Sequence, residues 1–110
     1  MTDKHIMIAA NECKPEVEDE YNRWYNDVHL PMFFEYEKLK KASRYKLKGD
    51  IPGCSKYLSV YEFETEDDLK GFLGSDAMKK AIEDFDRKWK QGEFINNWGA
   101  SYELIKRLER

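Results

Sequence analysis

The sequence has 110 residues, enough for one domain and too few for two, so we expect a single domain over residues 1–110. Charged residues make up 37% and aromatic residues 15%; because disordered chains are charged but poor in aromatics, this composition excludes disorder. The net charge of −3, with basic and acidic residues interleaved, argues against a nucleic-acid partner, which usually needs a basic stripe.

Membrane and export signals are missing from the sequence pattern. No apolar run approaches the roughly 20 residues that a membrane span needs, and the five apolar residues after His5 are too few for a signal peptide. Cys13 and Cys54 have neither the number of a disulfide framework nor the spacing of a zinc site. We therefore expect a cytoplasmic protein with reduced thiols, no metal and no membrane partner.

The N-terminal part predicts a strand followed by a helix. Residues 5–12 are a short apolar run typical of a buried strand, and Pro15 suits the first turn of a helix. Apolar side chains then recur with a helical period at Val17, Tyr21, Trp24, Tyr25 and Val28. Because Pro31 disfavours helical backbone at Leu30, the helix is predicted to end near His29.

The middle of the sequence predicts two strands. Residues 42–48 alternate in character, as a half-exposed strand does. Ser43, Tyr45 and Leu47 are assigned to its apolar side, and Arg44, Lys46 and Lys48 to its solvent side. Residues 57–64 follow a turn and are rich in residues that favour strands.

The C-terminal part predicts a helical region and a last strand. Thr65 and Ser75 are typical N-caps and start two successive helical segments. Residues 92–99 are interpreted as a loop and residues 100–108 as a strand. The order β-α-β-β-α-β predicts an α+β, ferredoxin-like fold in which a four-stranded antiparallel sheet carries two helices on one face.

Both faces of this sheet are expected to be apolar. The first strand offers Ile6, Ile8 and Ala10 to one face and Met7, Ala9 and Asn11 to the other. An uncovered apolar face this large would be an interaction site, and its cover is either a second copy of the chain, with a ligand cavity in the leftover space, or RNA. Residues 56–63 lack the glycines of an RNA-binding strand, which favours a homodimer through the sheet face.

The strand order resembles that of the dimeric α/β-barrel superfamily. Trp24, Tyr25, His29 and Pro31 resemble the Trp-Tyr/His-x-x-x-His-x-Pro pattern of its EthD-type branch. The resemblance implies a dimeric α/β barrel and a range of chemistry: cofactor-free quinone-forming monooxygenases, polyketide cyclases, muconolactone-type isomerases and haem degraders. Haem degraders pair an Asn on the first strand with a His on the second helix, and residues 75–91 contain no His. The resemblance therefore implies cofactor-free chemistry.

His29 is the candidate catalytic residue. Free histidine titrates near neutrality and can act as acid or base, and a position at a helix C-terminus should favour its protonated form. The competing interpretation is that His29 only caps the last carbonyl groups of the helix.

Five further residues are candidates for substrate binding. Asn11 either binds a substrate oxygen or begins a turn, and Tyr45 either hydrogen-bonds a phenolic or keto group or packs in the sheet. Trp24 lies on the apolar helix stripe, where core packing is the default. Phe33 is interpreted as part of a pocket lid or a dimer contact, and Trp98 as the roof of a cavity or a contact with the partner chain.

Two functional hypotheses follow. The first is a cofactor-free isomerase, cyclase or monooxygenase in which His29 acts as general acid or base on a small aromatic, polyketide-like or lactone substrate in an apolar pocket. The second is a non-catalytic homodimer that binds a small hydrophobic or aromatic ligand or serves as an accessory protein.

Overall fold

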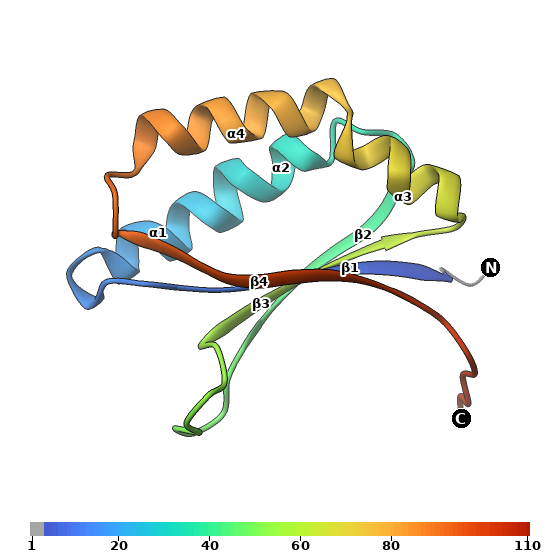
Figure 1. Ribbon diagram of the computed structural model, residues 1–110, viewed down its shortest axis with the longest axis horizontal. Coiled ribbons are helices and arrows are strands. Elements are labelled where there is room, and N and C mark those ends of the chain that lie inside the picture. The colour runs from blue at the N-terminus through green and yellow to red at the C-terminus, as the bar shows by residue number, and fades with distance from the viewer. Residues whose placement is uncertain (1–3) are drawn as a thin grey trace.

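Strand β1 (His5–Cys13) lies in the interior of a four-stranded sheet of order β2-β3-β1-β4. It pairs with β3 (Tyr57–Phe63) and β4 (Phe94–Glu103), and β3 pairs with β2 (Leu39–Lys46), every pair being antiparallel. The computed structural model describes residues 4–110. All helices cover one side of the sheet (Figure 1). The predicted ferredoxin-like α+β fold is therefore confirmed.

The helices form two groups above the sheet. The first is a continuous run of η1 (Pro15–Val17), α1 (Glu18–Trp24), η2 (Tyr25–His29) and α2 (Leu30–Phe33). The second consists of α3 (Glu66–Leu73) and α4 (Asp76–Lys88). The hydroxyl of Thr65 accepts a hydrogen bond from the Asp68 N–H, and that of Ser75 accepts one from the Met78 N–H. Both predicted N-caps thus begin the helices expected of them. Among residues 4–110, no helix has the length and hydrophobicity to cross a bilayer.

The first helix does not end at His29, so that prediction is wrong. The chain passes through a π turn, η2, in which the Leu30 N–H donates to the Tyr25 carbonyl, and it continues as α2 to Phe33. Pro31 has no N–H, and in a regular α-helix its ring would clash with the carbonyl four residues earlier. The wider π turn just before it relieves this clash, so the proline shifts the hydrogen-bond pattern without ending the helix.

Strand β4 begins at Phe94, so the predicted loop over residues 92–99 is wrong. Ala10 pairs with Trp98 and Asn11 with Asn96, which leaves Asn97 as the extra residue of a β-bulge. The Asn97 amide donates to Glu12 Oε2 at 2.8 Å and to Ser55 Oγ at 2.6 Å. The polar residues that suggested a loop are thus accommodated within a paired strand, and the strand ends at Glu103 rather than at residue 108.

Burial alternates strictly along β3, where Tyr57, Ser59, Tyr61 and Phe63 are buried beneath the helices. We call this side of the sheet the helix face and the other side the open face. Arg44 pairs with Ser59, which places its side chain on the helix face. The assignment of Arg44 to a solvent side was therefore wrong, because the helix run covers that side of the edge strand β2.

The interior beneath the helices contains two apolar clusters. One includes Phe33, Leu39, Tyr61, Phe63 and Phe72, and the other includes Tyr21, Trp24, Tyr25, Tyr57 and Trp89. Leu30 packs against both clusters, so the α2 end of the first helix run joins the two halves of the core.

Candidate active site beneath the helices

Four tyrosines lie between the first helix run and the sheet, and we call them the tyrosine layer: Tyr21, Tyr25, Tyr57 and Tyr61. The Ser59 hydroxyl donates to the Tyr25 hydroxyl at 2.7 Å, and the Tyr25 and Tyr61 hydroxyls are 3.1 Å apart. Burial is the main cause that raises the pKa of Tyr61, so this hydroxyl stays protonated. The hydroxyls of Tyr25 and Tyr61 and that of Ser59 therefore form one buried chain of contacts.

At the outer end of the layer, Tyr57 joins the sheet to the start of α1. Its hydroxyl donates to Glu18 Oε2 at 2.5 Å and accepts from the Asn22 amide at 3.1 Å. Lys56 Nζ also contacts Glu18 Oε2 at 2.5 Å. The hydrogen bonds from Lys56 and then Tyr57 lower the pKa of Glu18, so this carboxylate is ionised and already engaged.

Asn11 is fully enclosed on the helix face of β1, where its Oδ1 accepts a hydrogen bond from the Tyr21 hydroxyl. The strand continues to Cys13, so the alternative in which Asn11 begins a turn is wrong. Burial raises the pKa of Tyr21, and the nearby guanidinium of Arg44 offsets part of that rise. Asn11 is thus positioned by a neutral phenol rather than exposed in a loop.

Arg44 reaches across the tyrosine layer from β2. Its guanidinium carbon lies 4.3 Å from the ring centre of Tyr25, 5.1 Å from that of Tyr57 and 5.3 Å from that of Tyr21. Arg44 Nη1 donates to Asn26 Oδ1 at 2.8 Å. The faces of the three rings attract the cation, which fixes the guanidinium close to the hydroxyl groups of the layer.

His29 lies in the π turn, and its side chain is only 7% exposed. The imidazole stacks on Trp24, with ring centres 4.4 Å apart and planes at 23°, and meets the edges of Tyr25 and Phe33 at 4.8 Å and 4.5 Å. Its Nδ1 is buried and has no hydrogen-bond partner among residues 4–110.

This enclosure decides the charge of His29. Burial lowers its pKa from 6.5 to about 4, because the aromatic cage disfavours the charged imidazolium. Asp84 partly opposes this shift, and Arg44 adds to it. The expectation of a protonated His29 at a helix end is therefore wrong: the residue lies within a continuing helix and is neutral at neutral pH.

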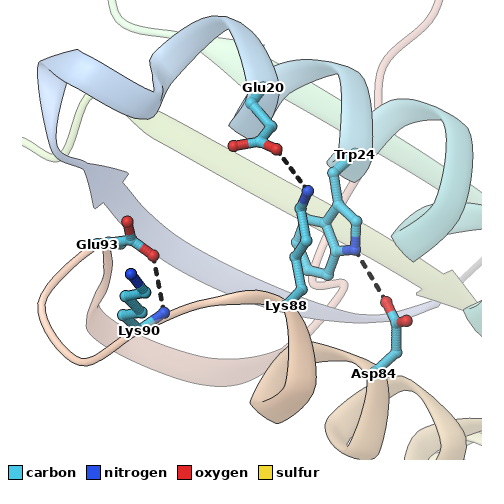
Figure 2. A network of polar contacts seen from close by, with 6 residues as sticks. All are labelled: Glu20, Trp24, Asp84, Lys88, Lys90 and Glu93. Carbon is cyan, nitrogen blue, oxygen red and sulfur yellow. Dashed lines mark hydrogen bonds and ion pairs between the residues drawn. The ribbon is translucent and has the colours of Figure 1, made fainter.

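Trp24 is held in place from the second helical group. Its Nε1 donates to Asp84 Oδ2 of α4 at 2.9 Å, and beside it Lys88 Nζ contacts Glu20 Oε2 at 2.6 Å (Figure 2). In the turn after α4, the Lys90 N–H donates to Glu93 Oε1 at 2.7 Å. The Trp24–Asp84 and Lys88–Glu20 contacts tie α4 to α1, and the first of them orients the indole face on which His29 stacks.

The structure divides the predicted site residues between the two faces of the sheet. His29, Trp24, Phe33 and Asn11 lie on the helix face, where Phe33 is a core residue against Tyr61 and Phe72 rather than part of a lid. Tyr45 and Trp98 lie on the open face and are 57% and 47% exposed. Tyr45 therefore does not share a site with His29 within one chain.

Two pockets lie on opposite faces of the sheet. One, of about 370 Å³, is bounded by the first helix run and β2 and is lined by Asn26, Leu30, Pro31, Phe34, Glu35 and Ala42. The other, of about 290 Å³, lies on the open face and includes Tyr45, Leu58, Cys54 and Trp98. Over residues 4–110, no three His, Cys, Asp or Glu side chains gather to hold a metal ion.

Arg44 and the tyrosine layer were missed as site residues by the sequence reasoning. The usable signal was the alternation on β3, where Tyr57, Ser59 and Tyr61 carry hydroxyl groups on one face. A basic residue on the same face of the neighbouring strand would lie against those groups. The arginine was instead assigned to solvent because its neighbours on β2 are lysines.

Comparison of the amino-acid sequence with known families identifies the family of this chain. Residues 6–97 match the family described as a domain of unknown function, DUF4286. The chain belongs to the DUF4286 family. Among curated proteins, none matches the sequence of this DUF4286 chain.

Solved structures resemble this DUF4286 chain along nearly its whole length. An EthD family protein from Bacillus halodurans has a TM-score of 0.67 at 16% identity, covering 92% of this chain and 99% of its own. SnoaB, a cofactor-independent oxygenase from Streptomyces nogalater, has a TM-score of 0.65 at 8% identity, covering 99% and 100%. A dimeric ferredoxin-like protein of unknown function from Thermobifida fusca has a TM-score of 0.60 at 14% identity, covering 94% of each chain.

These likenesses establish the fold of the DUF4286 chain. They confirm the fold that the resemblance to the dimeric α/β-barrel superfamily implied. At such low identities, the chemistry of this chain depends on its own residues.

Proposed function

We propose that this DUF4286 chain is a cofactor-free enzyme that acts on a small aromatic, polyketide-like or lactone substrate, with His29 as the acid–base residue. The observation that carries the proposal is the buried Nδ1 of His29, which has no partner among residues 4–110. Nearly all buried polar atoms in proteins are hydrogen-bonded, so an unpaired one inside an aromatic cage calls for a functional reason. A substrate hydroxyl or acidic C–H group would supply the missing partner.

A neutral imidazole suits this role. With a pKa of about 4, His29 is neutral at neutral pH and has a nitrogen free to accept a proton. It is a weaker base than free histidine, so the proposal requires a substrate with an activated proton. The surrounding tyrosine hydroxyls and Asn11 would orient a substrate oxygen. The fold shared with a cofactor-independent oxygenase supports oxygenation as the first reaction to test.

Such an oxygenation needs no cofactor, because the substrate supplies the electrons that reduce dioxygen. Loss of a proton from an activated methylene group gives a carbanion, which reduces dioxygen and forms a hydroperoxide at that carbon. Loss of water then leaves a carbonyl group, so the substrate supplies all the electrons. In this scheme His29 accepts the first proton, and the cation of Arg44 stabilises the negative charge on the substrate oxygen.

The proposal includes a homodimer through the open face. Tyr45, Trp98 and Tyr102 are large, exposed side chains there, and a surface of this kind is typical of a protein contact. The dimeric state of the Thermobifida fusca structure, which has the same fold, supports this arrangement. Both cysteines are free thiols, which supports a reducing, cytoplasmic location.

The test uses 1,8-dihydroxyanthrone, whose activated methylene group becomes a quinone carbonyl. Oxygen consumption and product formation are followed in the presence of a chelator, for the native chain, His29→Ala and the control His5→Ala. We expect His29→Ala to lower turnover by about 10²-fold or more, as loss of an acid–base group does, and His5→Ala to leave it unchanged. Equal turnover by His29→Ala and the native chain would remove His29 from the mechanism.

The alternative is a non-catalytic dimer that binds an apolar ligand. It is favoured by the open-face pocket, where Tyr45, Leu58 and Trp98 would be roofed by a partner chain. Saturable binding of the anthrone without any product, lost in Trp98→Ala and retained in His29→Ala, would support this alternative over the enzyme.

A further inference from the structure

Only one of the three guanidinium nitrogens of Arg44 has a hydrogen-bond partner among residues 4–110. Nη1 donates to Asn26, whereas Nε and Nη2 are buried and have no hydrogen-bond partner among residues 4–110. Over the same residues, no ion pair joins Arg44 to a carboxylate. Arg44 as a whole is only partly buried, but leaving these two buried N–H groups of a cation unpaired is costly, and this cost is offset when an anion binds them.

The geometry of the unpaired atoms defines what they fit. Nε and Nη2 lie on the same edge of the guanidinium, so their N–H groups are parallel and form one side of its planar fork. That edge matches two oxygens of a carboxylate or of a chelating enolate, which it binds bidentately. A single neutral oxygen can accept from both donors, but it leaves the positive charge without a counter-ion.

The acidic and polar groups near this edge are already engaged. Glu18 is held by Tyr57 and Lys56, and the amide oxygen of Asn11 by Tyr21. The guanidinium also lies over the rings of Tyr21, Tyr25 and Tyr57, which attract a cation but do not neutralise it.

An apolar pocket lies beside this cation. Asn26, which accepts from Arg44, also lines the pocket of about 370 Å³ together with Leu30, Phe34 and Ala42. Ala42 is two residues before Arg44 on β2, so the two share a face of that strand. The one carboxylate in the lining, Glu35, contacts Lys80 at 3.5 Å, which offsets its charge.

We propose that Arg44 binds the anionic end of the ligand, so that the ligand class is an aromatic carboxylate, or an aromatic ketone that becomes an enolate when it loses a proton in the site. This inference rests on the proposed function for the presence of a small aromatic ligand, and it adds the charge of that ligand. In this proposal the two oxygens bind the Nε–Nη2 edge, and the aromatic body extends toward the apolar pocket, whose lining residue Asn26 accepts from Nη1 of the same guanidinium.

The test compares 2-naphthoate with 2-naphthamide, which have the same shape and differ in charge. Isothermal titration of the full chain should show at least a tenfold preference for the carboxylate, about the factor expected of a charge-assisted hydrogen bond. Arg44→Met should bind the two probes equally. Arg44→Lys keeps a point charge without the fork and should retain only part of the preference.

Lys40→Gln is the matched control, since it removes one exposed positive charge from the same strand and should leave the preference unchanged. Circular dichroism confirms that each variant is folded. The proposal is overturned if the native chain binds both probes equally, fails to bind 2-naphthoate at millimolar concentration, or keeps its preference in Arg44→Met. Preferential binding of 2-naphthoate without turnover of the anthrone would sustain this inference while removing the catalytic proposal.

Discussion

The two faces of the sheet are built on opposite principles. On the helix face, Tyr57, Ser59 and Tyr61 bury hydroxyl groups, and each hydroxyl has a named partner. On the open face, the alternate residues of β3, Leu58 and Val60, are apolar and only partly buried. One face is thus specified by directional hydrogen bonds, and the other offers apolar area without directional contacts.

This difference is the basis for proposing chemistry on the helix face and association on the open face. A satisfied polar network fixes side chains in one arrangement, as a site requires. Contacts between apolar faces tolerate many arrangements, because most of their stability comes from the burial of apolar surface away from water. The three predictions below test the division, beginning with the largest expected effect.

The first prediction concerns the open face. Val60 is in the middle of it, between Ile8 on β1 and Ser43 on β2. Val60→Asp would bury an unpaired charge in any contact between two sheets, so we expect the dimer to dissociate completely at micromolar concentration into the 13.2 kDa monomer. Sedimentation equilibrium measures the mass.

Lys79→Asp, on the exposed side of α4, is the control for added negative charge and should leave the mass unchanged. A native chain that sediments as a monomer would contradict the homodimer and would leave the open face to another partner.

The second prediction concerns His29 and pH. Its pKa is about 4 in the folded chain and 6.5 in a free side chain, so the unfolded state binds the proton first as the pH falls. The contribution of His29 to the free energy of unfolding is therefore complete above pH 6.5, falls between pH 6.5 and 4, and is lost below that. The total is about 3 kcal/mol, from about 1.4 kcal/mol per pKa unit.

Urea titrations at several pH values measure this contribution as a difference between variants. His29→Phe keeps an aromatic ring without a titrating group, so its stability should vary less over this range than that of the native chain. His5→Gln should retain the native slope. Parallel curves for the native chain and His29→Phe would mean that the imidazole is not enclosed as described.

The third prediction compares two tyrosines across the sheet. Tyr25→Phe removes the hydroxyl that joins Ser59 to Tyr61, and it should lower the free energy of unfolding by about 1–2 kcal/mol because buried partners lose a hydrogen bond. Tyr45→Phe on the open face should change it by no more than about 0.5 kcal/mol. Urea denaturation compares the two, and equal losses would remove the distinction between the faces.

Much of the fold could be predicted because local patterns decide it. The alternation along 57–64 located β3 and separated its two faces, and Thr65 and Ser75 marked the starts of α3 and α4. The strand order then limited the topology to a ferredoxin-like sheet. Each of these signals depends on neighbours in sequence, which is the information that a single sequence contains.

The errors occurred where tertiary contacts override local signals. Asn97 suggests a loop, yet pairing with the long strand β1 holds it in a bulge of β4. Pro31 suggests a helix end, yet packing of Phe33 in the core extends the helix. The lysines beside Arg44 suggest a solvated face, yet the helix run covers it. For the same reason, the expected charge of His29 was wrong, because burial of its side chain in the fold lowers its pKa.

The π turn also has a consequence for how this helix can change. A π turn is equivalent to one extra residue in an α-helix, and one residue corresponds to a rotation of about 100° about the helix axis. The turn lies between Trp24 and Phe33 and contains His29. It therefore affects the directions in which these three side chains leave the helix. Deleting a single residue from η2 would restore the α-helical hydrogen-bond pattern and re-space the residues of this turn about the helix axis. This makes the length of that short segment, as much as its side chains, a determinant of which groups face the interior.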